Sequence, residues 1–191
     1  MFRSLVDFDK YLFGIVNQKA SNPFFDSIMP FIRQPLFWLP LYLFIILFAI
    51  YNFPKKAAMW IGSLLLTITI TDSVSSHIFK PLFGRLRPCN NPELADSIRL
   101  LVDHCGQNGS FTSSHATNHF GIAVFILITL DKIWGKFNYL FILWAAVISF
   151  AQVYVGVHFP FDVIGGALLG SGMGYLTATF FKRRSGCIEI I

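Results

Sequence analysis

The sequence predicts an all-α protein, a polytopic bundle of helices embedded in a membrane. Of its residues, 54% are hydrophobic and 17% aromatic, whereas only 13% are charged, a balance that a soluble domain of this size does not need. Several apolar runs also approach the roughly 20 residues that a helix needs to cross a hydrocarbon layer about 30 Å thick. Composition and run length together place the chain in a membrane.

Five apolar segments are predicted to span this membrane. The third is short for a span unless the polar turn before it is counted. We expect the five transmembrane helices at residues 36–53, 57–79, 116–130, 137–157 and 163–181.

The first 35 residues form a less regular N-terminal segment. They are apolar at 11–16 and 24–32, with a polar stretch between. This pattern allows either interfacial amphipathic helices or one broken span, which would be the sixth, and we favour the interfacial helices. No cleavable signal peptide is expected, because the first 20 residues carry charges and lack a clean apolar core.

Short basic loops predict the orientation. Lys55 and Lys56, the pair Lys132 and Lys136, and residues 182–184 fall on one side if five spans alternate. By the positive-inside bias that side is cytoplasmic. We therefore divide the chain into the segment 1–35, a membrane domain 36–181 with an outer loop 80–112, and a cytoplasmic tail 182–191.

The cysteines fit this topology. Cys89 and Cys105 share the outer loop, and Cys187 stands alone in the tail. An oxidising compartment would allow a disulfide in the loop, but the two thiols could equally stay free.

A first cluster of cations, in KPLFGRLRP, ends the second span. Lys80 and Arg87 are seven residues apart, and together they offer a phosphate a point charge and a forked donor. Snorkelling to lipid head groups is the alternative. Pro81 and Pro88 argue for irregular backbone, however, which membranes tolerate only when it is buried in protein or faces water.

The second stretch, TSSH, precedes the third span. Ser113 and Ser114 are good N-cap residues and put His115 in the first helical turn, where free N–H groups suit an anion. An ordinary cap with an interfacial histidine is the alternative. For His119, one turn further, we favour a structural role.

The third stretch, HFPFD, spaces His158 and Asp162 at i and i+4. A carboxylate there could hold the imidazole Nδ1–H and leave Nε2 free to attack. An ion pair that stabilises the start of the fifth helix is the alternative.

Together, KPLFGRLRP, TSSH and HFPFD resemble the three signature motifs of the type 2 phosphatidic acid phosphatase superfamily, which also contains vanadium haloperoxidases and glucose-6-phosphatase. The usual patterns are K-x6-R-P, P-S-G-H and S-R-x5-H-x3-D, and their order and spacing match over roughly residues 20–181.

The resemblance implies roles for these residues. His158 would attack phosphorus to form a phosphohistidine, Asp162 would orient it, and His115 would protonate the leaving oxygen and then activate water. The phosphate oxygens would be held by Lys80, Arg87, Ser113 and the backbone N–H of Ser114. No metal and no other cofactor is expected.

This sequence departs from the motifs at two places. Thr112 and Ser114 replace proline and glycine, which removes no side chain used in chemistry. Ala151 and Gln152 replace Ser-Arg, so a phosphate-binding arginine is missing. Gln152 can still donate a hydrogen bond to phosphate, but without charge. The pocket could borrow Arg85, prefer a less charged phosphate, or be slower.

We therefore expect an integral membrane phosphatase that hydrolyses a lipid phosphate or diphosphate at the outer face of a bacterial inner membrane. Undecaprenyl diphosphate, phosphatidic acid, phosphatidylglycerophosphate and lipid A phosphate are candidates among which the sequence does not choose. Its partners would be this lipid and the bilayer; nucleic acid binding has no support, and the oligomeric state is open. The alternatives are a non-catalytic protein that binds or transports anionic lipid, having lost activity through Gln152, and a phosphotransferase.

Two further features concern packing. Asp72 shares a face of the second span with Lys80 and could support it, but we favour an interhelical hydrogen bond. Gly166, Gly170 and Gly174 form a stripe that lets another backbone approach closely, and we expect this contact within the bundle rather than in a dimer.

Overall fold

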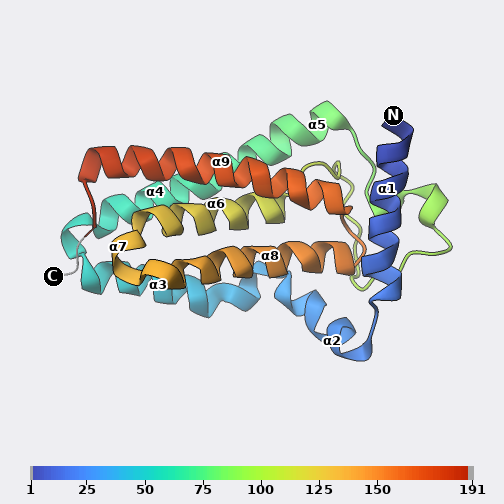
Figure 1. Cartoon of the computed structure of the whole chain (residues 1–191), viewed down its shortest axis with the longest axis horizontal. Helices are drawn as coiled ribbons and strands as arrows, with labels where there is room; N and C mark the ends of the chain where they lie inside the picture. The colour runs from blue at the N-terminus through green and yellow to red at the C-terminus, as the bar shows by residue number, and fades with distance from the viewer. Residues whose placement is uncertain (1, 189–191) are drawn as a thin grey trace.

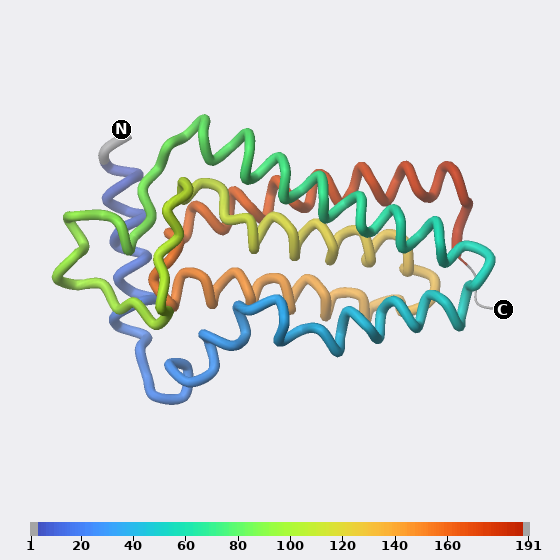
Figure 2. The backbone as a smooth tube through the Cα atoms, turned by 180° about the vertical axis from the view of Figure 1, so that it is seen from behind, coloured from blue at the N-terminus to red at the C-terminus, as the bar shows by residue number. Residues whose placement is uncertain are grey.

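The computed structural model describes residues 2–188, and the secondary structure of that range is helical, with no strand among these residues. Five long helices run side by side (Figures 1 and 2). The predicted all-α membrane bundle is thus confirmed. The five helices are α3 (Leu39–Asn52), α4 (Pro54–Ser73), α6 (Ser114–Thr129), α8 (Tyr139–Tyr154) and α9 (Pro160–Ser185).

Not all five helices are equally long. Within the described residues, four helical stretches are long and apolar enough to cross a membrane: 35–52, 54–94, 131–154 and 160–185. The second of these continues α4 through a π-helical turn (Val74–Phe79) into α5 (Lys80–Phe83). Helix α6, with 16 residues, reaches only about 24 Å at 1.5 Å per residue. The predicted third span therefore forms a helix, but it is shorter than the four continuous stretches, which have 18 to 41 residues.

Helix α6 packs closely against α9 along the glycine stripe. A Cβ atom at Gly166 would lie 2.7 Å from the carbonyl oxygen of Ser113, and Cβ atoms at Gly170 and Gly174 would collide with backbone carbonyls of α6. Only glycine allows this approach. The stripe thus serves packing within the bundle, as predicted.

Hydrogen bonds join polar side chains of different helices inside the bundle. Asn118 of α6 donates to Asp72 of α4 over 3.1 Å, which confirms the interhelical hydrogen bond favoured for Asp72. At the end of the bundle opposite α1, Trp60 donates to Thr129 over 2.9 Å. The basic loops also gather at that end (Figure 1), where Lys56 donates to the backbone of Cys187.

The N-terminal segment lies across the other end of the bundle. Helix α1 (Phe2–Gly14) runs transverse to the long helices, and α2 (Pro23–Ile32) follows beside them (Figures 1 and 2). Helix α1 buries Asp9 and Phe13 but exposes apolar side chains such as Leu5 and Phe8. The segment thus contains a helix that runs across the bundle end, and its place at the membrane interface stays a prediction.

The outer loop joins α5 to α6 and is tied down at several points. Cys89 and Cys105 form a disulfide with a Cα–Cα distance of 5.9 Å, so the bridged alternative is the one observed. Asn17, in the π-helical turn (Ile15–Lys19) after α1, donates to the carbonyls of Arg99 and Tyr154, each over 2.8 Å. The loop is therefore held against both the N-terminal segment and the end of α8.

Candidate active site

The three sequence stretches meet at the α1 end of the bundle. There a cavity of about 580 Å³ is lined by side chains from α2, the outer loop, α6 and α8. It brings together six of the eight residues singled out from the sequence: Lys80, Arg87, Ser114, His115, Gln152 and His158.

His158 sits in the short connection between α8 and α9. Gly156 turns the chain with φ +91°, and the backbone N–H of His158 donates to the carbonyl of Gln152 over 3.2 Å. Pro160 then begins α9, where its fixed φ is favourable. The imidazole is thereby held on a rigid turn and is only 2% exposed.

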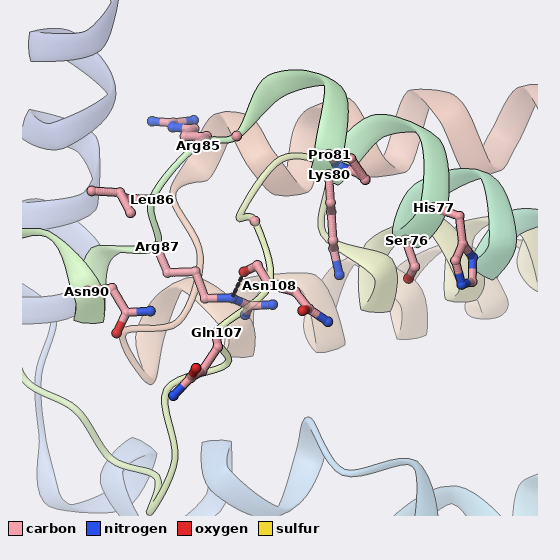
Figure 3. Close-up of a pocket in the computed structure, with 12 residues that line it drawn as sticks. Ser76, His77, Lys80, Pro81, Arg85, Leu86, Arg87, Asn90, Gln107 and Asn108 are labelled. Atoms are coloured by element: carbon pink, nitrogen blue, oxygen red, sulfur yellow. Dashed lines mark hydrogen bonds between the residues drawn. The ribbon is translucent and has the colours of Figure 1, made fainter.

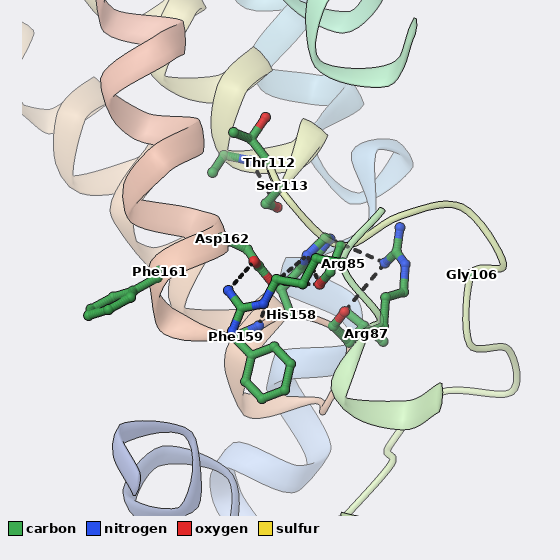
Figure 4. A network of polar contacts seen from close by, with 12 residues as sticks. Arg85, Arg87, Gly106, Thr112, Ser113, His158, Phe159, Phe161 and Asp162 are labelled. Atoms are coloured by element: carbon green, nitrogen blue, oxygen red, sulfur yellow. Dashed lines mark hydrogen bonds and ion pairs between the residues drawn. The ribbon is translucent and has the colours of Figure 1, made fainter. Parts of the chain in front are cut away.

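Asp162 lies behind His158, as the i, i+4 spacing predicts. Its Oδ2 is 3.6 Å from Nδ1 of His158 and accepts from the backbone N–H of Phe159 over 2.8 Å. Ser110 of the outer loop joins the pair, with its Oγ 3.4 Å from Nδ1 and 2.5 Å from Oδ2. Figure 4 shows His158, Phe159 and Asp162 in this network. Ser110 lies outside the motif residues and could not be found from their spacing.

Arg87 contacts the other imidazole nitrogen. Its Nη1 is 3.2 Å from Nε2 of His158, and its Nε donates to the carbonyl of Asn108 over 3.1 Å. A guanidinium group can only donate, so Nε2 must be the unprotonated nitrogen and Nδ1 must carry the proton. This tautomer leaves the Nε2 lone pair on the cavity side.

The electrostatic surroundings keep this imidazole neutral. Burial lowers the pKa of His158 from its ordinary value of 6.5 to about 4; Asp162 opposes this shift, while the charges of Arg87 and Lys80 add to it. At neutral pH, His158 therefore holds an available lone pair.

Arg85 has a different place from the one considered from the sequence. It does not line the cavity with His158. Instead its two terminal nitrogens bind Asp162 Oδ1 at 2.7 Å and Asp9 Oδ2 at 2.5 Å, and its guanidinium covers the Phe159 ring at 4.3 Å. The alternative that the pocket borrows Arg85 as a phosphate ligand is thus not supported, because Arg85 is engaged behind Asp162.

Asp9 of α1 completes this chain of charges. Its side chain is 1% exposed and also accepts from the backbone N–H of Phe161 over 2.9 Å. Burial raises the pKa of Asp9, and the bond to Arg85 opposes that rise. The transverse helix α1 is therefore linked through Arg85 to the carboxylate that holds His158.

Lys80 enters the cavity from the start of α5. It is 8% exposed, and its Nζ donates to Oγ of Ser114 over 2.7 Å. Ser113 lies deeper: it is fully buried and does not line the cavity, and its Oγ accepts from the N–H of Ala116 at 3.5 Å as the N-cap of α6. The predicted cap is confirmed.

A second hollow lies on the far side of the cations. It has a volume of about 550 Å³ and shares Lys80 and Arg87 with the first cavity. Figure 3 shows Lys80 and Arg87 pointing into it beside Asn108. The two cations thus stand between two open spaces.

The two histidines of α6 differ in their surroundings. His115 lines the cavity in the first turn. His119 bonds through Nδ1 to the His115 carbonyl over 2.7 Å and through Nε2 to the Tyr42 hydroxyl over 3.2 Å. Both of its nitrogens are used inside the bundle, as the structural role predicted for it requires.

Gln152 occupies the place of the missing motif arginine. It is fully buried, and its Oε1 accepts from Nε of Arg33 over 3.3 Å. Its Nε2 is buried without a hydrogen-bond partner among the described residues. Arg33 follows the last residue of α2 and lines the same cavity. Motif spacing could not reveal this pair, because 119 residues separate its members.

The sequence is similar to known membrane-lipid phosphatases. The model of the PAP2 superfamily matches residues 57–185. A lipid A 4'-phosphatase of Bacteroides thetaiotaomicron is 35% identical over 92% of this chain and 78% of its own length. An undecaprenyl-diphosphatase of Sulfolobus acidocaldarius is 29% identical over 90% of this chain and 78% of its own length.

Two solved structures share the fold. A transmembrane PAP2-type phosphatidylglycerolphosphate phosphatase from Bacillus subtilis superposes with a TM-score of 0.73 at 21% identity, covering 94% of this chain and 87% of that one. Aquifex aeolicus LpxE superposes with a TM-score of 0.62 at 26% identity, covering 88% of this chain and 93% of that one.

Proposed function

Because this chain belongs to the PAP2 superfamily, we propose that it is an integral membrane phosphatase that hydrolyses a lipid phosphate through a phosphohistidine intermediate. The observation that carries this proposal is the neutral His158, fixed in one tautomer by Asp162 and facing a cavity that also holds His115, Lys80 and Arg87. A nucleophile, a proton donor and cations for the phosphate are all in reach of one bound group.

In the first step, Nε2 of His158 attacks phosphorus and the bond from phosphorus to the lipid oxygen breaks. Burial lowers the pKa of His115 to about 3 in the free site; the negative charge of a bound phosphate favours the protonated imidazole, which gives its proton to the departing oxygen. Asp162 and Ser110 stabilise the positive charge that develops on the imidazole, which keeps its Nδ1 proton. Arg87 moves its donors from Nε2 to the phosphate oxygens, which gain charge in the transition state.

In the second step, His115 accepts a proton from water and the water oxygen attacks phosphorus. The phosphorus–nitrogen bond breaks, its electron pair returns to Nε2 so that His158 is neutral again, and inorganic phosphate is released. Lys80, Arg87, Ser114 and the N-terminal end of α6 hold the phosphate in both steps. Ser113 acts as the cap that shapes this helix end. No metal takes part in either step.

For the substrate, we propose a phosphate monoester of lipid A. The support is the similarity to the lipid A 4'-phosphatases of Bacteroides thetaiotaomicron and Porphyromonas gingivalis, which extends over 92% and 90% of this chain. Undecaprenyl diphosphate is the second candidate, favoured by the similarity to the Sulfolobus enzyme. With the diphosphate, the leaving group would be a lipid monophosphate.

We further propose that the cavity faces the outside of a bacterial inner membrane, with residues 36–181 as the catalytic membrane domain and 182–191 as a cytoplasmic tail. The clustering of basic loops at the opposite end supports this orientation, as does the outer-loop disulfide, which forms in oxidising compartments. In intact cells, a membrane-impermeant maleimide should label Asp96→Cys in a Cys187→Ser background. In the wild-type chain, the reagent should label Cys187 only after permeabilisation, and the reverse pattern would contradict this orientation.

The activity itself is tested by phosphate release from a panel of lipid phosphates in EDTA, with purified protein in detergent. We expect release by the wild type, fastest from lipid A phosphate, and none by His158→Ala. A folded wild type that releases no phosphate from any lipid would favour the non-catalytic binding protein instead. Product analysis with an added alcohol acceptor separates hydrolysis from phosphotransfer.

A further inference from the structure

Arg33 lines the cavity with a guanidinium group that binds no carboxylate among the described residues, although Asp103 lines the same cavity. Within residues 4–188 it makes no ion pair, and its recorded side-chain bond goes to the neutral amide of Gln152. In the same part of the chain, Arg87 likewise contacts only neutral groups, whereas Arg85 binds two carboxylates and Arg99 binds Asp26. Arg33 is thus held by a group that orients a guanidinium without neutralising it.

The surroundings make this arrangement unfavourable without an anion. Burial and the nearby charge of Arg87 both lower the pKa of Arg33, and Lys80 lines the same cavity. Like charges that are partly desolvated together destabilise one another unless an anion joins them. A phosphate in the cavity would meet all three cations.

The pairing with Gln152 gives this anion a definite place. Gln152 stands where the motif has its arginine, six residues before His158, and its backbone carbonyl accepts from the N–H of His158. Arg33 approaches from α2, on another part of the chain, and its Nε reaches the Gln152 amide. The Arg33 guanidinium therefore lies beside the position that the motif arginine would fill.

We propose that Arg33 is a phosphate-binding residue that replaces the arginine missing from the third motif, with Gln152 as the positioning residue that aims it. This inference rests on the proposed phosphatase function and names one more ligand of the same site. Arg33 supplies the positive charge that the motif arginine would carry at residue 152. The cavity therefore has three cations, Arg33, Lys80 and Arg87, for a doubly charged monoester. Removal of α2 or displacement of its end would then weaken phosphate binding without altering His158.

The test compares Arg33→Gln with the wild type and with Arg183→Gln, which removes an exposed charge at the opposite end of the bundle. The readouts are kcat and KM on the best lipid of the panel, the dissociation constant for orthovanadate as a mimic of the pentacoordinate phosphate, and the melting temperature. We expect Arg33→Gln to lower kcat/KM by about 100-fold and to weaken vanadate binding at least tenfold, with Arg33→Lys in between and Arg183→Gln unchanged.

The outcomes separate this inference from the proposal beneath it. Wild-type kcat/KM and vanadate affinity in Arg33→Gln would overturn the role of Arg33 and leave the phosphatase standing. A loss of activity with unchanged vanadate affinity would also overturn it, because Arg33 would then not touch the phosphate. A wild type that binds vanadate through Arg33 but hydrolyses no lipid would overturn the phosphatase alone.

Discussion

Arg87 lies 3.2 Å from Nε2 of His158 through its Nη1 atom, so the guanidinium suited to hold a phosphate covers the nitrogen suited to attack it. The contact fixes the imidazole tautomer before any substrate arrives. It also means that a phosphate which draws Arg87 toward its oxygens uncovers the nucleophile at the same moment. Binding and activation are then coupled through one residue.

Asp162→Asn should lower kcat by about 10³- to 10⁴-fold, because a neutral amide no longer fixes the tautomer of His158 or stabilises its developing positive charge. The measurement is kcat on the best lipid phosphate, with circular dichroism to show that the helices are intact.

The matched control for this variant is Asp131→Asn. Asp131 pairs with Lys182 at 3.5 Å on the exposed opposite end, so its loss should leave kcat within about twofold, as for most surface pairs. A near-wild-type kcat in Asp162→Asn would remove Asp162 from the mechanism.

Asp9→Asn should destabilise the fold by on the order of 2 kcal/mol, because it leaves Arg85 with one carboxylate in place of two at a buried site. The value is moderate because Arg85 is 25% exposed. The free energy of unfolding in mixed micelles measures the effect. Lys10→Gln is the control, since Lys10 pairs with Glu93, which is largely exposed, and should change stability by less than about 0.5 kcal/mol. Equal effects of the two substitutions would contradict the link from α1 to the site.

His158 should titrate with a midpoint near pH 4, followed by ¹⁵N NMR of labelled protein in detergent. Arg87→Gln should raise this midpoint, because a nearby positive charge is removed, and Asp162→Asn should lower it. Because the pKa of the folded state lies below the ordinary 6.5, neutral His158 contributes stability above about pH 6.5. That stability is lost as the pH falls from about 6.5 to 4. A midpoint near 6.5 would show that His158 is not buried as described.

Gly170→Ala should destabilise the bundle by about 1 to 3 kcal/mol, because the added methyl group meets the Thr117 carbonyl between α6 and α9. Gly172→Ala lies on the same helix with open space around its Cβ position and should be neutral or slightly stabilising. Melting temperatures in one detergent compare the two. If both variants melt with the wild type, close contact at the glycine stripe does not support the fold.

Much of the fold could be predicted because lipid imposes a simple rule: a span must be apolar and helical. The five helices accordingly appear near the predicted segments, although α9 extends beyond the predicted residue 181 to Ser185. The exact number of spans was harder to predict, since α6 has only 16 residues and many of them are buried against neighbouring helices. For the N-terminal segment, the sequence only favoured interfacial helices over a broken span, because an amphipathic pattern does not specify where a helix docks.

Within the site, sequence spacing predicted the contacts between residues that are close together in the chain. His158 and Asp162 come together because His158 lies just before α9 and Asp162 lies in the first turn of that helix, so only a short piece of chain separates them. Long-range partners stayed hidden: Asp9 meets Arg85 across 76 residues and Arg33 meets Gln152 across 119. Such pairs depend on how α1 and α2 cross the bundle end, which no periodicity encodes.

The most direct measurement of the central claim is to trap the covalent intermediate. Wild-type protein is mixed with ³²P-labelled lipid phosphate, quenched in base, where phosphohistidine survives, and digested to locate the label. We predict label on the peptide that contains His158, none in His158→Ala, and loss of the label when excess unlabelled lipid is added before quenching. Steady phosphate release with no label on His158 would contradict the phosphohistidine mechanism.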